Sequence, residues 1–180
     1  MGSGSLISGA FSGGGAGGDL AFIERFGLDA AGAASSMSSQ SFVGVNEIIA
    51  FYQIYNGNDN VDVGFRPNGI TSGYDNQSRN FAGGNITQTT MFSYRSSSAH
   101  TGFGTAHIMS GNGAIGAGVT MGMTCTQNWG IWDTSASTMS LVGCSAGIIV
   151  ENTDLITSIT IAVTAGTIYG DCVIYGYTES

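Results

Sequence analysis

The sequence predicts an all-β fold, an antiparallel two-layer β-sandwich of jelly-roll type with an extended Gly-rich N-terminal arm. Three observations predict it. Hydrophobic residues make up 42 % of the chain, enough for a core despite 30 glycines and one proline. Apolar residues alternate with small or polar ones in several short runs, which is the period of a strand. Stretches rich in Gly, Asn and Ser separate these runs, giving roughly eight to ten strands.

The chain divides into a short arm and one domain. Residues 1–18 (MGSGSLISGAFSGGGAGG) are too rich in glycine for regular structure, whereas residues 19–180 form the predicted single β-sandwich domain. Three apolar residues, Leu6, Ile7 and Phe11, interrupt the glycines. One interpretation is a plain tail. Our hypothesis is an arm that packs these three side chains on a neighbouring subunit.

The first half of the domain contains the clearest predicted hairpin. Glu47–Tyr55 (EIIAFYQIY) is apolar on both faces, which is typical of a central strand covered on each side. Residues 56–60 (NGNDN) favour a tight turn, and 61–65 alternate again, so we expect a hairpin. Before it we expect strands at Leu20–Asp29 and Ser36–Phe42, separated by a small-residue turn at Ala30–Ser35.

The second half alternates between polar connections and strands. Ile115–Thr126 is the cleanest strand, with one apolar face and one face of Gly and Thr that another strand, a loop or a neighbouring subunit covers. We expect further strands at Thr87–Tyr94 and Met139–Val150, a polar loop at Asp75–Gly84 and a Ser/Gly-rich connection at Arg95–Gly104.

The closing segment, Ile156–Tyr177, predicts an antiparallel pair of strands. Alternation runs to Val163, Thr164-Ala165-Gly166 supplies a turn, and alternation resumes at Ile168. We expect this pair to close the sandwich, with its inner side chains packed on the Ile115–Cys125 face. These inner side chains are Ile159, Ile161, Val163, Cys172 and Ile174.

Charge is scarce throughout the chain. Charged residues are 9 % of the sequence, well below the roughly 25 % of an ordinary soluble domain. Lysine is absent, and four arginines against twelve acids give a formal charge of −8. This balance argues against nucleic acid and anionic membranes as partners. A surface of Ser, Thr, Asn and Gly suits a protein covered by copies of itself or by a larger assembly, although a low-charge monomer is the alternative.

Metal sites and cofactor sites have little support in the sequence. Cys125, Cys144 and Cys172 lack CxxC spacing, and each lies in an apolar run, so we expect buried, reduced thiols. Their spacing leaves open a disulfide within or between subunits. His100 and His107 lie seven residues apart with no Asp or Glu nearby in sequence, which favours ordinary surface or interface histidines over a metal pair.

Catalytic motifs are also missing from the sequence. It contains no GxSxG nucleophile elbow, no P-loop and no dinucleotide fingerprint. The aspartates fall mostly at expected turns and strand ends, where Asp bonds locally to the backbone. The sequence leaves open a glycosidase-type pair of carboxylates that are distant in sequence and converge in the fold. We expect a non-enzymatic protein without catalytic residues, a metal or a cofactor.

Two tryptophans, Trp129 and Trp132, follow the cleanest strand in a turn-like stretch (NWGIWDT). Exposed indoles would suit carbohydrate stacking or an interface anchor, whereas indoles under a sheet edge would belong to the core. We expect core or interface packing, and we group both tryptophans with the three arm residues as candidate interface residues.

Two segments of the chain resemble a family of small β-sandwich proteins in tailed-phage virions. The closing segment has the pattern Ile-x-Ser-Ile-x-Ile … Gly and ends on Ile-Tyr-Gly-Tyr at 174–177, where the family ends on a Leu-Tyr-Gly-Ile-like strand. Residues 66–74 (RPNGITSGY) resemble the family's Arg-Phe-Asn-Gly-Asp-x-Gly-x-Asn-Tyr segment. The match holds at Arg66, Asn68, Gly69, Gly73 and Tyr74, whereas Pro67 replaces an aromatic and Ile70 replaces an Asp. Because position 70 lacks the carboxylate of the family's Asp, the resemblance implies no metal site here. We interpret this segment as a structural loop.

The resemblance implies a virion structural protein without enzymatic activity. We expect a capsid decoration (cement) protein that stabilises the shell, with the major capsid protein and copies of itself as partners, as homotrimers at local threefold axes. No signal peptide precedes the domain, so we expect synthesis in the host cytoplasm and assembly into the virion. The alternative is a tail or baseplate receptor- or carbohydrate-binding module. It predicts exposed aromatics that line a groove at the sandwich tip, among Tyr52, Tyr55, Tyr74, Trp129 and Trp132.

Overall fold

The computed structural model describes most of the predicted domain. The described residues are 20–56, 61–80, 91–96, 100–110, 122–134, 136–149 and 154–177. The predicted arm, with Leu6, Ile7 and Phe11, lies outside them, as does most of the predicted Ile115–Thr126 strand.

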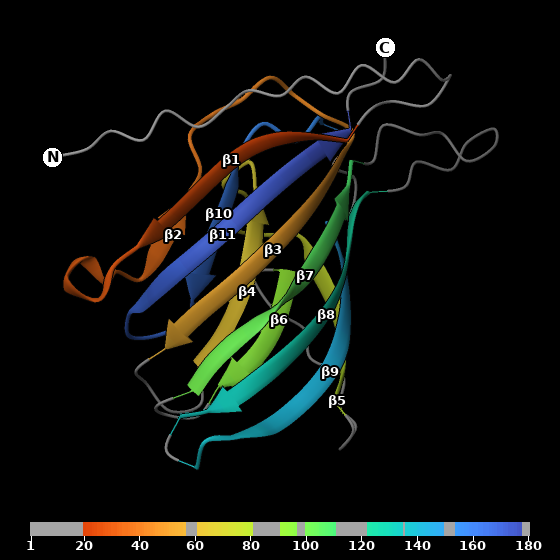
Figure 1. Ribbon diagram of the computed structural model, residues 1–180. Coiled ribbons are helices and arrows are strands. Elements are labelled where there is room, and N and C mark those ends of the chain that lie inside the picture. The colour runs from red at the N-terminus through yellow and green to blue at the C-terminus, as the bar shows by residue number, and fades with distance from the viewer. Residues whose placement is uncertain are drawn as a thin grey trace, which may run out of the picture.

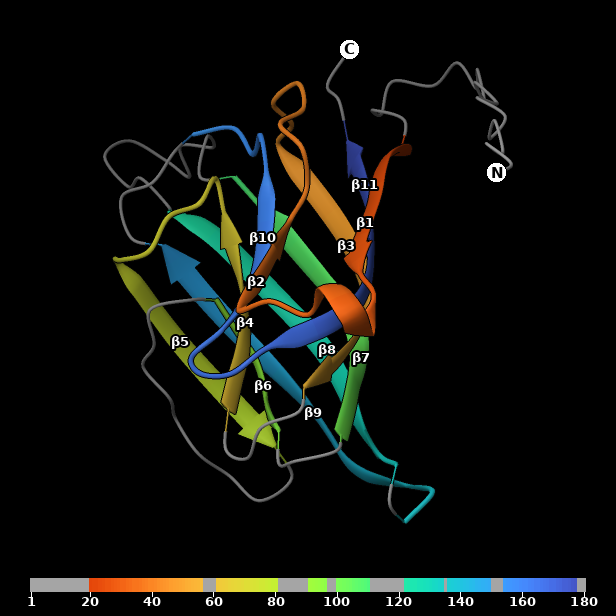
Figure 2. The same ribbon diagram turned by 90° about the vertical axis from the view of Figure 1, so that its left-hand side faces the viewer.

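Within these residues the chain forms a two-layer antiparallel β-sandwich, so the predicted fold class is confirmed (Figure 1). One sheet has the order β1-β11-β3-β7-β8-β9-β5, and the other has the order β2-β10-β4-β6. In Figure 2, β2, β10 and β4 lie side by side in a layer separate from β1, β11 and β3. In chain order the elements are β1 (Leu20–Leu28), η1 (Ala30–Gly32, a 3-10 helix), β2 (Ser36–Ser38), β3 (Glu47–Asn56), β4 (Val61–Pro67), β5 (Tyr74–Asn80), β6 (Met91–Ser96), β7 (His100–Met109), β8 (Met123–Asp133), β9 (Thr138–Ile149), β10 (Ile159–Val163) and β11 (Ile168–Tyr177).

Strand β3 is central in its sheet, as predicted, but only one of its faces is covered. It lies between β11 and β7, and inward-facing Ile48, Ala50 and Ile54 are fully buried. On the other face Phe51 is 47 % exposed, so the expectation of cover on both sides is wrong. A sheet in a two-layer sandwich packs only one of its faces against the core. Core packing therefore does not explain the apolar residues on the outer face of β3.

Both predicted hairpins are wrong, because their strands lie in different sheets. Strand β4 pairs with β10 and β6, whereas β3 pairs with β11 and β7. Likewise β10 pairs with β2 and β4, and β11 pairs with β1 and β3. At each connection the chain changes layer. Alternating apolar residues are needed equally by strands that pair and by strands that face each other across a core, so the pattern cannot separate the two cases.

The core lies between the two sheets, and the expected inner residues of the closing segment belong to it. Ile159, Ile161, Val163, Cys172 and Ile174 are all buried. An edge-to-face ring contact between Tyr52 of β3 and Phe65 of β4, with centroids 5.3 Å apart, joins the layers. Of the predicted Ile115–Cys125 face, the described residues Met123 and Cys125 are both buried.

Two segments expected to be connections are strands. The polar stretch after Tyr74 forms β5, which pairs with β9 at the edge of the larger sheet, where apolar side chains are not required. The Ser/Gly-rich connection contains the start of β7 at His100. Glycine is needed there, since a Cβ on Gly104 would lie 2.2 Å from the carbonyl oxygen of Asn128 and 2.9 Å from the hydroxyl of Tyr52.

The loop after β4 is built on Asn68, as the sequence indicated. Asn68 and Gly69 adopt positive φ angles of 52° and 66°. The Oδ1 atom of Asn68 accepts from the backbone N–H of Thr157 at 2.7 Å, and its Nδ2 donates to the carbonyl of Leu155 at 2.8 Å. The Tyr74 hydroxyl donates to the carbonyl of Ile70 at 2.7 Å. The loop therefore ties β4 to the segment that precedes β10.

Replacing Ile161 by Asp should abolish folding. The side chain is fully buried between the sheets, and an unpaired buried charge costs several kcal/mol, comparable with the ~5–15 kcal/mol that stabilises a whole domain. Circular dichroism and thermal unfolding provide the measurement. Thr160→Asp is the matched control, because Thr160 hydrogen-bonds to Ser38 on the exposed face of the same strand. Cooperative unfolding of the Ile161 variant near the wild-type temperature would contradict this account of the core.

Replacing Asn68 by Ala should lower the free energy of unfolding by about 2 kcal/mol, because the four side-chain hydrogen bonds to Leu155, Thr157 and Ser158 are lost and Ala must adopt a positive φ. Asn68→Gly removes the same bonds without the backbone strain and should cost less. Urea unfolding of both variants separates the two contributions. Equal stability of the Ala variant and the wild type would show that the loop does not fasten β10.

Candidate functional site

The outer face of the larger sheet is unusually aromatic. On a sandwich of two layers this face would ordinarily carry polar side chains. Here Phe22 on β1 is 59 % exposed, Phe51 on β3 is 47 % exposed and Trp132 on β8 is 40 % exposed. A protein that leaves several large aromatic side chains on one face exposes a surface that a ligand or partner can cover.

Ring contacts organise this face. Tyr175 of β11 makes edge-to-face contacts with Phe22 and Phe51, with centroids 5.8 Å and 6.0 Å apart. Tyr55 and Tyr169 lie cross-strand with centroids 4.6 Å apart. These contacts hold the rings in fixed positions over β1, β11 and β3.

A groove of about 660 Å³ runs across the same face, over five neighbouring strands from Arg25 on β1 to Trp132 on β8. Its volume is in the range of ligand pockets in proteins. Aromatic and aliphatic side chains from β3, β7, β8 and β11 line it, together with a few polar ones; the apolar members are Phe51, Phe103, Trp132 and Val173. We name it the outer groove.

A glycine shapes one wall of the outer groove. Gly130 on β8 is the cross-strand partner of Phe103 on β7. A Cβ at Gly130 would lie 2.6 Å from Cζ of Phe103, so the phenyl ring rests directly on the backbone of the neighbouring strand. Any larger residue at position 130 would push this ring away and change the shape of the groove.

The polar side chains of the groove carry no net charge. Nε of Arg25 donates to Oδ1 of Asp171 at 3.1 Å, and both side chains are more than half exposed. This hydrogen bond, with the charge of Asp171, raises the pKa of Arg25. The remaining polar members, Gln53, Thr101 and Thr105, are neutral.

The two tryptophans lie on opposite faces of strand β8. The stretch NWGIWDT is part of this strand, so the expected turn there is wrong. Residues three positions apart in a strand point to opposite sides. Trp129 is therefore 5 % exposed in the core, against Gly143, whereas Trp132 reaches the outer groove.

The five aromatic residues that we expected to line one groove therefore do not share one surface. Tyr52, Tyr74 and Trp129 are buried core residues, Tyr55 is half-buried, and only Trp132 is exposed. The outer groove lies on the face of the sheet rather than at the sandwich tip. Sequence reasoning missed Phe51, whose outward position follows from the alternation of β3 once a two-layer fold is assumed.

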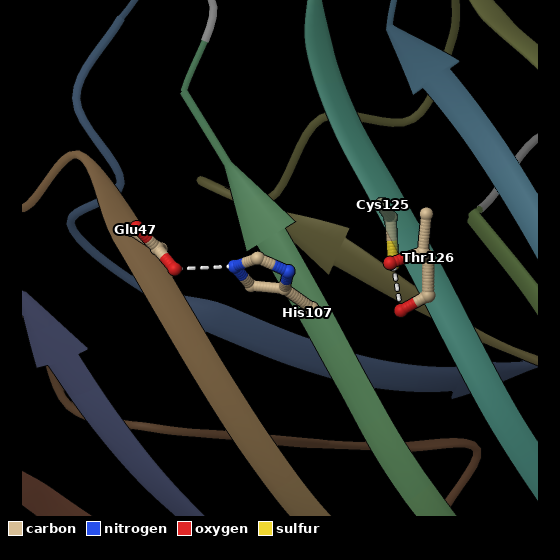
Figure 3. Close-up of polar contacts among 4 residues, drawn as sticks. All are labelled: Glu47, His107, Cys125 and Thr126. Atoms are coloured by element: carbon tan, nitrogen blue, oxygen red, sulfur yellow. Dashed lines mark hydrogen bonds and ion pairs between the residues drawn. The ribbon is translucent and has the colours of Figure 1, made fainter.

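Each histidine has a carboxylate partner from another strand. Nε2 of His107 lies 2.5 Å from Oε1 of Glu47, and Nε2 of His100 lies 3.5 Å from Oδ2 of Asp133 (Figure 3 shows the first pair). The partners are 60 and 33 positions away in sequence, where no local pattern could indicate them. Among the described residues no group of three His, Cys, Asp or Glu side chains could hold a metal ion.

The cysteines are free thiols in two different environments. Cys125 and Cys172 are buried, as expected, but Cys144 on β9 is exposed, so the expectation of three buried thiols is wrong. Burial raises the pKa of Cys125 to about 12, and its Sγ lies 4.0 Å from the carbonyl of Thr126 (Figure 3). Cys125 faces the core while His107 faces outward, so these two do not form a nucleophile–base pair.

No protein-family model, no curated protein and no solved structure significantly matches this chain. In the part of the chain that the structure describes, no helix is long and apolar enough to cross a membrane.

Native protein should react with one equivalent of a thiol reagent at neutral pH, and denatured protein with three. Cys144 is exposed, whereas Cys125 and Cys172 are buried and their thiols have raised pKa values because burial disfavours the thiolate. A maleimide labelling series with intact-mass detection measures this. Cys144→Ser should remove the native reaction, and rapid labelling of that variant would contradict the buried positions of the other two.

Proposed function

We propose that the chain is a non-enzymatic structural protein of a tailed-phage virion, and within the virion a capsid decoration protein that stabilises the shell. The resemblance of residues 66–74 and 156–177 to that family supports the proposal, as does a surface with few charges. In this role the protein adds interface area to the shell at many copies, and its effect is mechanical.

The observation that carries this proposal is a set of five exposed apolar side chains that lie toward one end of the sandwich. Val43 is 86 % exposed, Phe22 59 %, Leu20 44 %, Met109 40 % and Leu155 39 %. We name these five residues the end patch. Scattered exposed aliphatics are ordinary on a protein surface, but five at one end favour a docking surface.

Strand register places Leu20 and Met109 at the same end of the larger sheet. Leu20 pairs with Tyr177, which pairs with Glu47, and Glu47 pairs with Met109, so these residues form one row across the sheet. Phe22 is next on the outer face of β1. A Cβ on Gly44 would lie 2.8 Å from Leu155, which places the loop of Val43 beside Leu155 at this end. In Figure 1 the arrowheads of β11 and β7 mark it.

The end patch suits attachment to a shell. Burying apolar surface contributes roughly 25 cal/mol per Å², and a stable interface buries about 800 Å² on each partner. We propose the major capsid protein as one partner and copies of this chain as the other, in trimers at local threefold axes. The arm with Leu6, Ile7 and Phe11 precedes Leu20, so in this proposal it adds its apolar residues to the same interface.

Val43→Asp should reduce attachment to purified particles about tenfold or more, because burying a carboxylate in an apolar interface costs several kcal/mol. Met139→Asp is the matched control, since Met139 is 51 % exposed and pairs with Trp132, far along the sheet from the Glu47 row. Quantitative gels of particles measure bound protein. Hundreds of copies per wild-type particle with selective loss in the Val43 variant support decoration. A handful of copies, or equal binding of both variants, refutes it.

A second candidate function is a receptor- or carbohydrate-binding module of the tail or baseplate. The outer groove favours it, because Phe51, Phe103 and Trp132 lie beside neutral hydrogen-bonding side chains there. This candidate requires few copies per particle, so the same gels separate it from decoration.

A further inference from the structure

We propose that the outer groove is a binding site for a neutral oligosaccharide, held across strands β3, β7 and β8. This inference deepens the carbohydrate-binding candidate by naming the residues and the ligand class. It stands on the chemistry of the groove alone and does not depend on where in a particle the protein lies.

Three aromatic side chains cross the groove on a diagonal. Phe51 is opposite Thr105, and Phe103 is two residues before Thr105 on the same strand. Phe103 in turn is opposite Gly130, and Trp132 is two residues beyond Gly130. Such diagonal neighbours are roughly 7–8 Å apart, so the three rings form a regular track. An extended chain of similar units fits this track better than a single compact ligand does.

Each aromatic ring of the track has a polar neighbour in its own row of the sheet. Thr105 is beside Phe51, Gln53 is beside Phe103, and Thr101 is beside Trp132. The face of an aromatic ring carries negative charge density and attracts the C–H groups of a pyranose, while hydroxyl and amide groups bond to its hydroxyls. A sugar presents both kinds of group on every unit, which matches a ring and a polar side chain in every row.

The charges at the groove favour a neutral ligand. Arg25 and Asp171 are its charged members and neutralise each other through their 3.1 Å contact. The pair offers a donor and an acceptor at one end of the groove without attracting ions of either sign. A phosphorylated or nucleotide ligand would need excess cations that these side chains do not supply.

The groove is also held rigid. Its side chains stand on hydrogen-bonded strands, Phe103 rests on Gly130, and Phe51 contacts the ring of Tyr175. Side chains that are already fixed lose less conformational entropy when a ligand binds. The Thr101 and Trp132 row lies toward the opposite end of the sheet from Glu47 and Met109, so the end patch can be occupied while this part of the groove is open.

The experiment is an array of neutral linear oligosaccharides of glucose, mannose, galactose and N-acetylglucosamine, followed by calorimetric titration with the hexasaccharide that binds best. Trp132→Ala and Gln53→Ala should each weaken binding, the first about tenfold or more because a stacking surface is lost. Met109→Ala is the matched control, because Met109 is exposed on the same face but does not line the groove.

Binding that is lost in the Trp132 variant and kept in the Met109 variant supports the inference. No binding to any neutral glycan at millimolar concentration overturns it, as does equal binding by both variants. Concentration-dependent dimers that Trp132→Ala dissolves would also overturn it, because a second copy would then occupy the groove. If the groove binds no glycan but the protein is present at hundreds of copies per particle, the decoration proposal still stands. Failure of the glycan inference can therefore be distinguished from failure of the decoration proposal.

Discussion

Burial of one apolar layer between two sheets is the constraint on which the rest of this structure depends. The chain changes layer between β10 and β11, and each of these strands buries one face in the same core, through Ile161 on one side and Ile174 on the other. Tyr52 and Phe65 meet edge to face across the layers. Because the core uses one face of each strand, the larger sheet retains a second face that packing does not need.

This second face divides along the strands into two surfaces of different character. Leu20, Phe22 and Met109 of the end patch lie toward one end of this face, where Leu20 pairs with Tyr177, and Val43 and Leu155 extend the patch from adjoining connections. The outer groove joins aromatic rings to neutral polar groups nearer the other end. An aliphatic surface suits a close-packed protein partner, whereas a polar and aromatic groove suits a hydroxyl-rich ligand. If both proposals hold, one sheet would serve attachment at one end and recognition nearer the other.

Local patterns in the sequence predicted the fold class, most strands and the inner residues, because alternation reports which side of a strand is buried. They did not predict which strands pair with each other. The β3 pattern is equally compatible with a hairpin and with a layer change, and the polar edge strand β5 has no apolar pattern at all. The contacts of His107 with Glu47 and the diagonal from Phe51 to Trp132 depend on register between distant strands. The Asn68 loop was predictable because Asn-Gly chemistry is local.

The pairing of Leu20 with Tyr177 has a mechanical consequence. The two residues are neighbours at the same end of an antiparallel ladder, so a force that draws them apart loads the hydrogen bonds of β1 and β11 one after another. Such a ladder opens like a zipper at low force, whereas strands pulled along their length must break many bonds together. A pull through Met109, which lies on the interior strand β7, does not load this ladder directly. The sandwich would therefore resist tension best when the force enters through an interior strand and not through Leu20 and Tyr177.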